Sequence, residues 1–222
     1  MWAQVLLPSS CIRLEPGGYA RCVVRVRNLG LTADRFAFEV VGAAASWTTL
    51  DPPVLELGPE ATSQVVAHFR PPRAAHVRAG SMPFGVLTTS AREAVGSVVE
   101  QLLEVGRFTD TIVDLVPRVI RRRSATFALT VNNRGNDTVR LRVRGRDLAG
   151  ALRVECAPES LTVFPGALAH SGIRVRPTHW RWSGAALTRP FQVIVQAGQD
   201  TPLVVAGELV HHAILSYASG PV

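Results

Sequence analysis

The sequence predicts an all-β protein built from two tandem β-sandwich domains, because it combines an internal repeat with a period-two alternation of apolar and polar residues. Residues 24–30 and 129–135, which read VRVRNLG and LTVNNRG, are the clearest repeated pair. The copies stay in register through later proline motifs, and their offset drifts only from 105 to 107 residues. Two short loop insertions explain that drift, so we expect domains at 1–107 and 108–222.

The first copy shows its expected strands in chain order. In the segment RCVVRVR, Cys22, Val24 and Val26 alternate with mainly charged neighbours, as in a strand with one buried face. Gly30 then suits a turn, because glycine tolerates positive φ. Further strands are expected at 35–41, 54–57, 63–69, 84–89 and 97–105, with a loop at 73–81 and Trp47 in the core.

The second copy repeats this order, with Leu152 where the first copy has Trp47. Its strands are expected around 125–131, 139–143, 161–163, 173–175, 191–195 and 203–209. No segment has convincing helical periodicity, so we expect no helix. Seven or so short strands per copy, separated by Gly, Pro and Asn turns, are typical of the immunoglobulin-like antiparallel β-sandwich.

The order of short motifs resembles tandem immunoglobulin-like modules of actinobacteria. It runs Pro16-Gly17, VRVRNLG, Asp34-Arg35-Phe36, Trp47 before Pro52-Pro53, Pro59-Glu60, Arg70-Pro71-Pro72 and Pro83-Phe84-Gly85-Val86. Some such proteins carry the label "hydrolytic protein", and similar reading frames stand beside phage-tail-like contractile injection systems. The resemblance covers nearly the whole chain and rests on scaffold motifs. It implies the fold and a structural part in a larger bacterial assembly.

The charge of the chain is unevenly distributed. All 24 basic residues are arginine, which a GC-rich genome explains, and the formal net charge is +7. Residues 1–107 carry +1 and residues 108–222 carry +6. Because net charge bears on partners rather than on fold, we expect the second domain to make the main contacts.

The sequence offers no export or membrane signal. No apolar run approaches the roughly 20 residues of a membrane-spanning helix, and the first residues lack the basic start of a signal peptide. We therefore expect a cytoplasmic protein with no membrane span.

No constellation for catalysis or metal binding is recognisable, so we expect no enzyme, no cofactor and no metal. The chain has no Gly-x-Ser-x-Gly elbow, no HExxH and no glycine-rich phosphate loop, and Asp110 and Asp114 fit a solvated surface. His211 and His212 are neighbours on a strand and would point to opposite faces. The cysteines, best interpreted as small buried hydrophobic residues with a Cys11–Cys22 bridge as the alternative, are Cys11, Cys22 and Cys156.

Two sets of arginines stand out in the second copy. One is the run Arg121, Arg122 and Arg123; the other recurs at period two, at Arg140, Arg142, Arg144 and Arg146. Residues at period two share one face of a strand, about 6.5–7 Å apart. Three interpretations stay open: a solvated face paired with carboxylates across the strand, a surface for an acidic protein, and a nucleic-acid surface. The last lacks the interleaved stacking aromatics of single-strand binders.

A loop of different composition follows Arg176-Pro177: His179, Trp180, Arg181 and Trp182. Tryptophan and arginine are enriched at interface hot spots, which favours a contact role, although one tryptophan could instead fold over the sandwich edge. We therefore expect a non-catalytic structural or protein-binding module that contacts a protein partner through these residues and the two arginine sets. The alternatives are an accessory carbohydrate or surface-polymer module, and nucleic-acid binding by the basic second domain.

Overall fold

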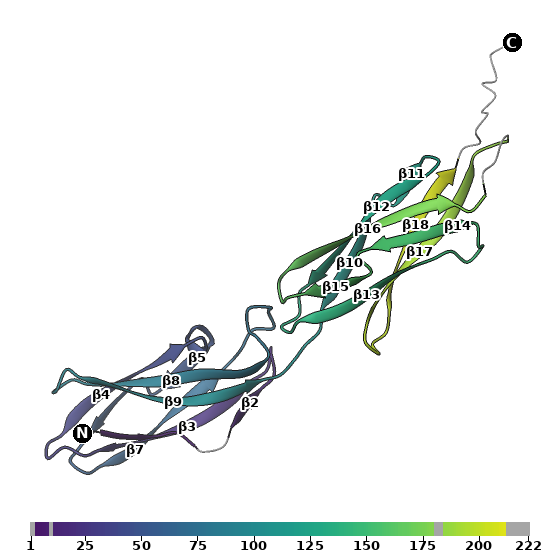
Figure 1. The fold of residues 1–222 in the computed structure, drawn as a ribbon. Coiled ribbons are helices and arrows are strands. Elements are labelled where there is room, and N and C mark those ends of the chain that lie inside the picture. The colour runs from purple at the N-terminus through teal and green to yellow at the C-terminus, as the bar shows by residue number, and fades with distance from the viewer. Residues whose placement is uncertain (1–2, 9–10, 180–183, 212–222) are drawn as a thin grey trace. The chain divides into compact units, whose positions relative to one another are not determined.

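The computed structural model describes residues 3–8, 11–179 and 184–211. The chain divides into two compact units, Met1–Phe108 and Thr109–Val222. Each unit is a sandwich of a four-stranded and a five-stranded sheet (Figure 1). The predicted fold class, two tandem immunoglobulin-like β-sandwiches, is confirmed.

The described residues of the first unit form nine strands. Its four-stranded sheet has the order β1 (Ala3–Leu6), β3 (Ala20–Asn28), β7 (Thr62–Phe69) and β5 (Thr48–Asp51). Its five-stranded sheet has the order β2 (Ile12–Leu14), β9 (Gly96–Val105), β8 (Gly80–Ser90), β4 (Asp34–Gly42) and β6 (Val54–Leu57). A short 3-10 helix, η1, spans Ala45–Trp47.

The second unit repeats this topology strand for strand. The four-stranded sheet has the order β10 (Thr111–Val116), β12 (Ala125–Asn133), β16 (Leu168–Pro177) and β14 (Leu152–Ala157). The five-stranded sheet has the order β11 (Val119–Arg121), β18 (Leu203–His211), β17 (Leu187–Ala197), β13 (Val139–Arg146) and β15 (Ser160–Val163). The sequence repeat is therefore also a repeat of strand pairing.

Three details differ from the sequence-based expectation. The edge pairs β2–β9 and β11–β18 are parallel, whereas all other pairs are antiparallel among the described residues. The three-residue 3-10 turn η1 was not expected, although the described residues contain no α-helix, as predicted. It is too short to show a helical period and is held by a hydrogen bond from Thr48 Oγ1 to the Ala44 carbonyl (2.7 Å). Strand β8 begins at Gly80, inside the expected loop.

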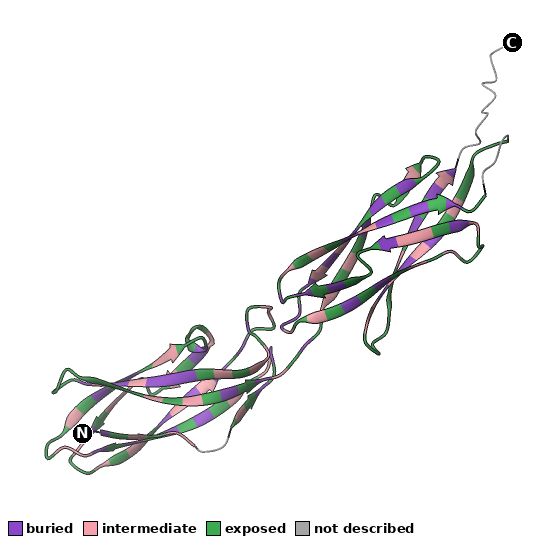
Figure 2. Cartoon of the chain, in the orientation of Figure 1, coloured by how far each residue is buried: buried purple, intermediate pink, exposed green. Residues whose placement is uncertain are grey.

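Along most strands, buried and exposed residues alternate, and the buried side of each strand contributes to the core of its unit (Figure 2). In the first unit Phe69 on β7 packs edge-on against Phe84, with ring centroids 5.2 Å apart. In the second, Phe127 on β12 packs against Phe191 at 4.9 Å. Trp47 is partly buried and lies against the first core, at 6.3 Å from Phe69. The aromatic pair is thus kept, but one of its rings comes from a different strand.

The asparagine of the repeated motif holds the turn that follows it. Asn28 is buried and donates from Nδ2 to the carbonyls of Thr32 (2.9 Å) and Leu57 (3.0 Å), while its Oδ1 accepts from the Gly30 N–H (2.8 Å). Asn133 makes the same bonds in the second unit, to Asp137 (2.8 Å), Val163 (2.9 Å) and Gly135 (3.0 Å). This side chain satisfies buried backbone groups in both copies, which explains why the motif recurs.

The three cysteines are not bridged. Cys22 and Cys156 are buried and free, as expected for small core residues. Cys11 is also free but exposed, so the interpretation as a buried residue is wrong for this position. No helix among the described residues is long and apolar enough to cross a membrane.

Candidate functional site

Strand β13 presents four arginines on one side and the core on the other. Leu141 and Val143 are buried, and the alternating Arg140, Arg142, Arg144 and Arg146, called the arginine row below, are exposed. The core therefore fixes which way the strand faces, because its inward residues cannot turn outward without exposing the sandwich interior. Period two then places all four guanidinium groups on the outer face of the five-stranded sheet.

The neighbours of the arginine row across the sheet are uncharged. Arg140 lies opposite Thr162, and Arg142 lies opposite Ser160 on one side and Gln196 on the other. Arg144 and Arg146 lie opposite Ile194 and Gln192. Within the described ranges, none of the four side chains makes an ion pair or a hydrogen bond. The interpretation as a solvated face paired with carboxylates across the strand is therefore wrong in its pairing, whereas the face itself is exposed.

Two of the carboxylates near this region are engaged elsewhere. Glu155, on the other sheet, pairs with Arg176 (2.8 Å) and Arg153 (3.0 Å). Asp147 follows the row directly, but its carboxylate accepts backbone N–H groups of Ala151 (2.6 Å) and Leu152 (2.7 Å). Asp147 thus shapes the loop after β13 rather than neutralising an arginine.

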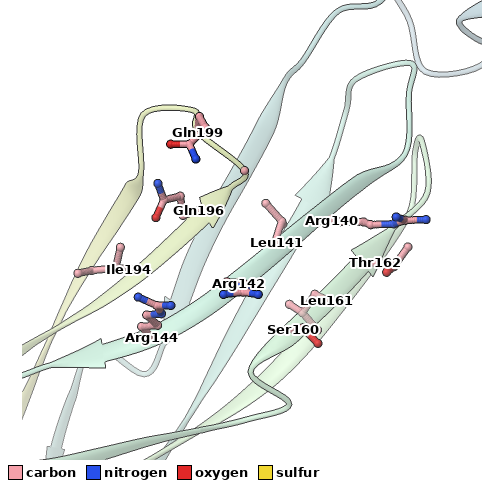
Figure 3. Close-up of a pocket in the computed structure, with 11 residues that line it drawn as sticks. Arg140, Leu141, Arg142, Arg144, Ser160, Leu161, Thr162, Ile194, Gln196 and Gln199 are labelled. Atoms are coloured by element: carbon pink, nitrogen blue, oxygen red, sulfur yellow. The ribbon is translucent and has the colours of Figure 1, made fainter.

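Three of the four arginines of the row line a groove of about 510 Å³ (Figure 3). Arg140, Arg142 and Arg144 line it together with Ser160 and Thr162 of β15. Gln196 of β17 and Gln199 of the following turn line the opposite side. Guanidinium, hydroxyl and amide groups all donate hydrogen bonds, and no carboxylate lines the groove. The groove thus presents positive charge and hydrogen-bond donors.

The remaining predicted site residues are not gathered at this groove. Arg121 lies on β11, separated from β13 by β18 and β17, and Arg122 and Arg123 follow it, all exposed. Arg122 lines a different hollow, of about 520 Å³, beside Arg174. His179 is exposed, and Trp180, Arg181 and Trp182 lie outside the described residues.

Sequence reasoning missed the neutral half of the groove. Ser160, Thr162 and Gln196 carry no motif, and they meet the arginine row only through the registers of β13 with β15 and β17. A comparison with the first copy could have revealed it. There Arg35 lies opposite Glu56, whereas the equivalent Arg140 of the second copy lies opposite Thr162. Aligning β6 with β15 reveals that this acidic position has been lost.

The described residues contain neither a metal-binding cluster nor an activated buried thiol. No three His, Cys, Asp or Glu side chains gather there in a way that could hold a metal ion. Burial raises the pKa of the Cys22 thiol to about 11, and burial followed by the nearby Glu159 carboxylate raises the pKa of Cys156. A raised pKa disfavours the thiolate at neutral pH, so neither buried cysteine is activated as a nucleophile.

No family model matches this chain, and no curated protein matches it in sequence. Among solved structures, a protein of unknown function from Porphyromonas gingivalis W83 is similar at 16% identity and a TM-score of 0.35, over 95% of this chain and 100% of that one. The D00-D0 domain of Intimin is similar at 10% identity and 0.40, over 94% and 99%. The CupB2 chaperone of Pseudomonas aeruginosa is similar at 10% and 0.35, over 92% and 100%. The strand pairing, rather than these distant likenesses, defines the fold.

Proposed function

We propose that this chain is a non-catalytic binding module whose second unit docks an acidic protein surface onto the arginine row. The observation that carries the proposal is that four exposed guanidinium groups stand together with no carboxylate opposite them in register. Each guanidinium group can bind a carboxylate of a partner, often by donating two parallel hydrogen bonds to it. A surface of one sign also speeds the encounter with an oppositely charged partner.

A protein partner fits this face better than nucleic acid. Proteins that bind single strands combine basic residues with aromatic side chains on which bases stack. The outward positions of β13, β15, β17 and β18 hold no aromatic residue in the part of the chain that the structure describes. Ile194 and Val204 instead give the face an apolar centre beside the charges, as in protein–protein interfaces.

The proposed setting is a larger bacterial assembly, such as a contractile injection (phage-tail-like) particle. That setting is implied by the resemblance of the sequence motifs, whereas the docking face is argued from geometry. A component of such an assembly needs a stable scaffold and a contact surface, and the sandwich core and the arginine row supply these two parts.

Binding of a fluorescent polyglutamate peptide, compared with duplex DNA of equal charge, tests the proposal. Anisotropy titrations use the wild-type chain, the double variant Arg142→Ser/Arg144→Ser, and a control of equal charge, Arg21→Ser/Arg25→Ser on β3. The row variant is expected to bind the peptide at least about tenfold more weakly, and the control within about twofold of wild type. If both variants lost peptide affinity equally, the binding would depend on net charge alone and the proposal would fail. Tighter binding of DNA than of the peptide would assign the face to nucleic acid.

A further inference from the structure

The corresponding face of the first unit carries the opposite charge. Arg13 and Arg35 are the only basic residues at the described outward positions of its five-stranded sheet. Four exposed glutamates on the same side outnumber them: Glu39 on β4, Glu56 on β6, and Glu100 and Glu104 on β9, called the acidic face below. None of these four carboxylates makes an ion pair or a hydrogen bond within the described residues.

One position reverses its charge between the two copies, and a second position loses its charge. Glu39 on β4 and Arg144 on β13 are at equivalent positions of the repeat. The residues that lie opposite them on the neighbouring strand, Leu87 and Ile194, are equivalent as well. Glu100 is likewise replaced by an uncharged residue in β18. The apolar centre is kept, with Leu87 beside Val98 in one unit and Ile194 beside Val204 in the other. The two faces thus share a backbone shape and differ in sign.

From this complementarity we propose that the acidic partner of the arginine row is the acidic face of a second copy of this chain. The inference rests on the proposed function of the row and names its partner. Each copy then offers one basic and one acidic face, so the contact joins different surfaces. Such a contact closes into a ring where its rotation permits and otherwise continues as a filament.

The area of the faces is large enough for a specific contact. The five strands of each sheet lie about 4.8 Å apart and average about seven residues, so each face measures roughly 24 by 24 Å, or about 580 Å². Two such faces would bury on the order of 1,150 Å², just above the roughly 1,000 Å² that a specific interface needs. Because exposed charges supply much of the attraction, association should weaken as salt rises.

Sedimentation velocity of the full chain with charge-reversal variants tests the inference. The variants are Arg142→Glu/Arg144→Glu, which reverses the row, and Glu39→Arg/Glu100→Arg, which reverses the acidic face. At about 20 mM salt the wild-type mass should rise between about 10 and about 200 µM, and this rise should shrink at about 300 mM. Each variant alone should need at least about tenfold more protein to associate, whereas their equimolar mixture should associate again, because opposite faces then meet.

The control Arg21→Glu/Arg25→Glu makes the same charge change on the four-stranded sheet and should associate as wild type does. A wild-type chain that stays monomeric at low salt, or a mixture that fails to associate, would overturn the inference. Polyglutamate binding separates the two proposals. If it persists while the chain stays monomeric, the arginine row binds another acidic protein, and if it is lost as well, the proposed function also fails.

Discussion

Strand β4 of the first unit and strand β13 of the second are the same strand of one repeated sandwich, yet their exposed sides have little in common. On β4 the outward residues are Arg35, Ala37, Glu39 and Val41; on β13 arginine stands at all four equivalent places. The inward residues, such as Phe36 and Leu141, stay apolar. Burial constrains one side of the strand and leaves the other free to diverge, so the exposed side is where function can change.

The inside of the sandwich also diverged, but in a compensated way. The ring that packs against Phe84 comes from Phe69 on β7, whereas the ring against Phe191 comes from Phe127 on β12. At the place of Phe127 the first unit has a cysteine, and at the place of Phe69 the second has Val175. Volume moved from one strand to its neighbour while the total stayed similar, as dense packing requires.

The largest expected effect tests this exchange of volume. Phe127→Cys copies the first unit's residue into the second core and should cost about 3 kcal/mol of unfolding free energy, because it leaves a cavity. Adding Val175→Phe puts the ring where the first unit has it and should recover more than half of the loss. Denaturant unfolding with hydrogen exchange of second-unit peptides measures both. A double variant no more stable than the single one would contradict the compensation.

The next effect concerns what the units share. Asn28→Ala and Asn133→Ala each leave at least two carbonyls, one of them buried, and one N–H without the asparagine, so each should lower the stability of its own unit by about 2–3 kcal/mol. Hydrogen exchange of the strands around each turn assigns the loss to a unit. Asn132→Ala, a half-buried neighbour on β12, is the control and should cost much less. Losses that differ widely between the two units would show that the turn is not held alike.

The smallest expected effect separates function from fold. Arg142→Ser removes an exposed charge between two others about 7 Å away, so it should leave stability unchanged or raise it by about 0.5 kcal/mol at low salt. Thermal unfolding at low and high salt measures this, and the small gain should vanish at high salt. A clear loss of stability would mean that the row serves the fold. The control Arg35→Ser on the acidic face of the first unit should show no gain in stability, because Arg35 lies opposite Glu56.

The sequence predicted the features that depend on neighbours in the chain. The alternation of Cys22, Val24 and Val26 predicts a half-buried strand, and the same rule predicts that the arginines of β13 share a face. The parallel pairing of Ile12 with Leu103 was missed, because it joins residues far apart in the chain. The groove was missed for the same reason, since Thr162 meets Arg140 only through the register between strands.

The most direct test of the account moves the arginine row onto the first unit. In a chain that carries Arg142→Ser/Arg144→Ser, the substitutions Ala37→Arg, Glu39→Arg and Val41→Arg rebuild the row on β4. If exposed arginines on this shared scaffold are what binds the peptide, the affinity for polyglutamate should return to within about threefold of wild type, because the spacing of the charges and the shape of the backbone are the same. A folded chain with the rebuilt row that still fails to bind the peptide would contradict the account.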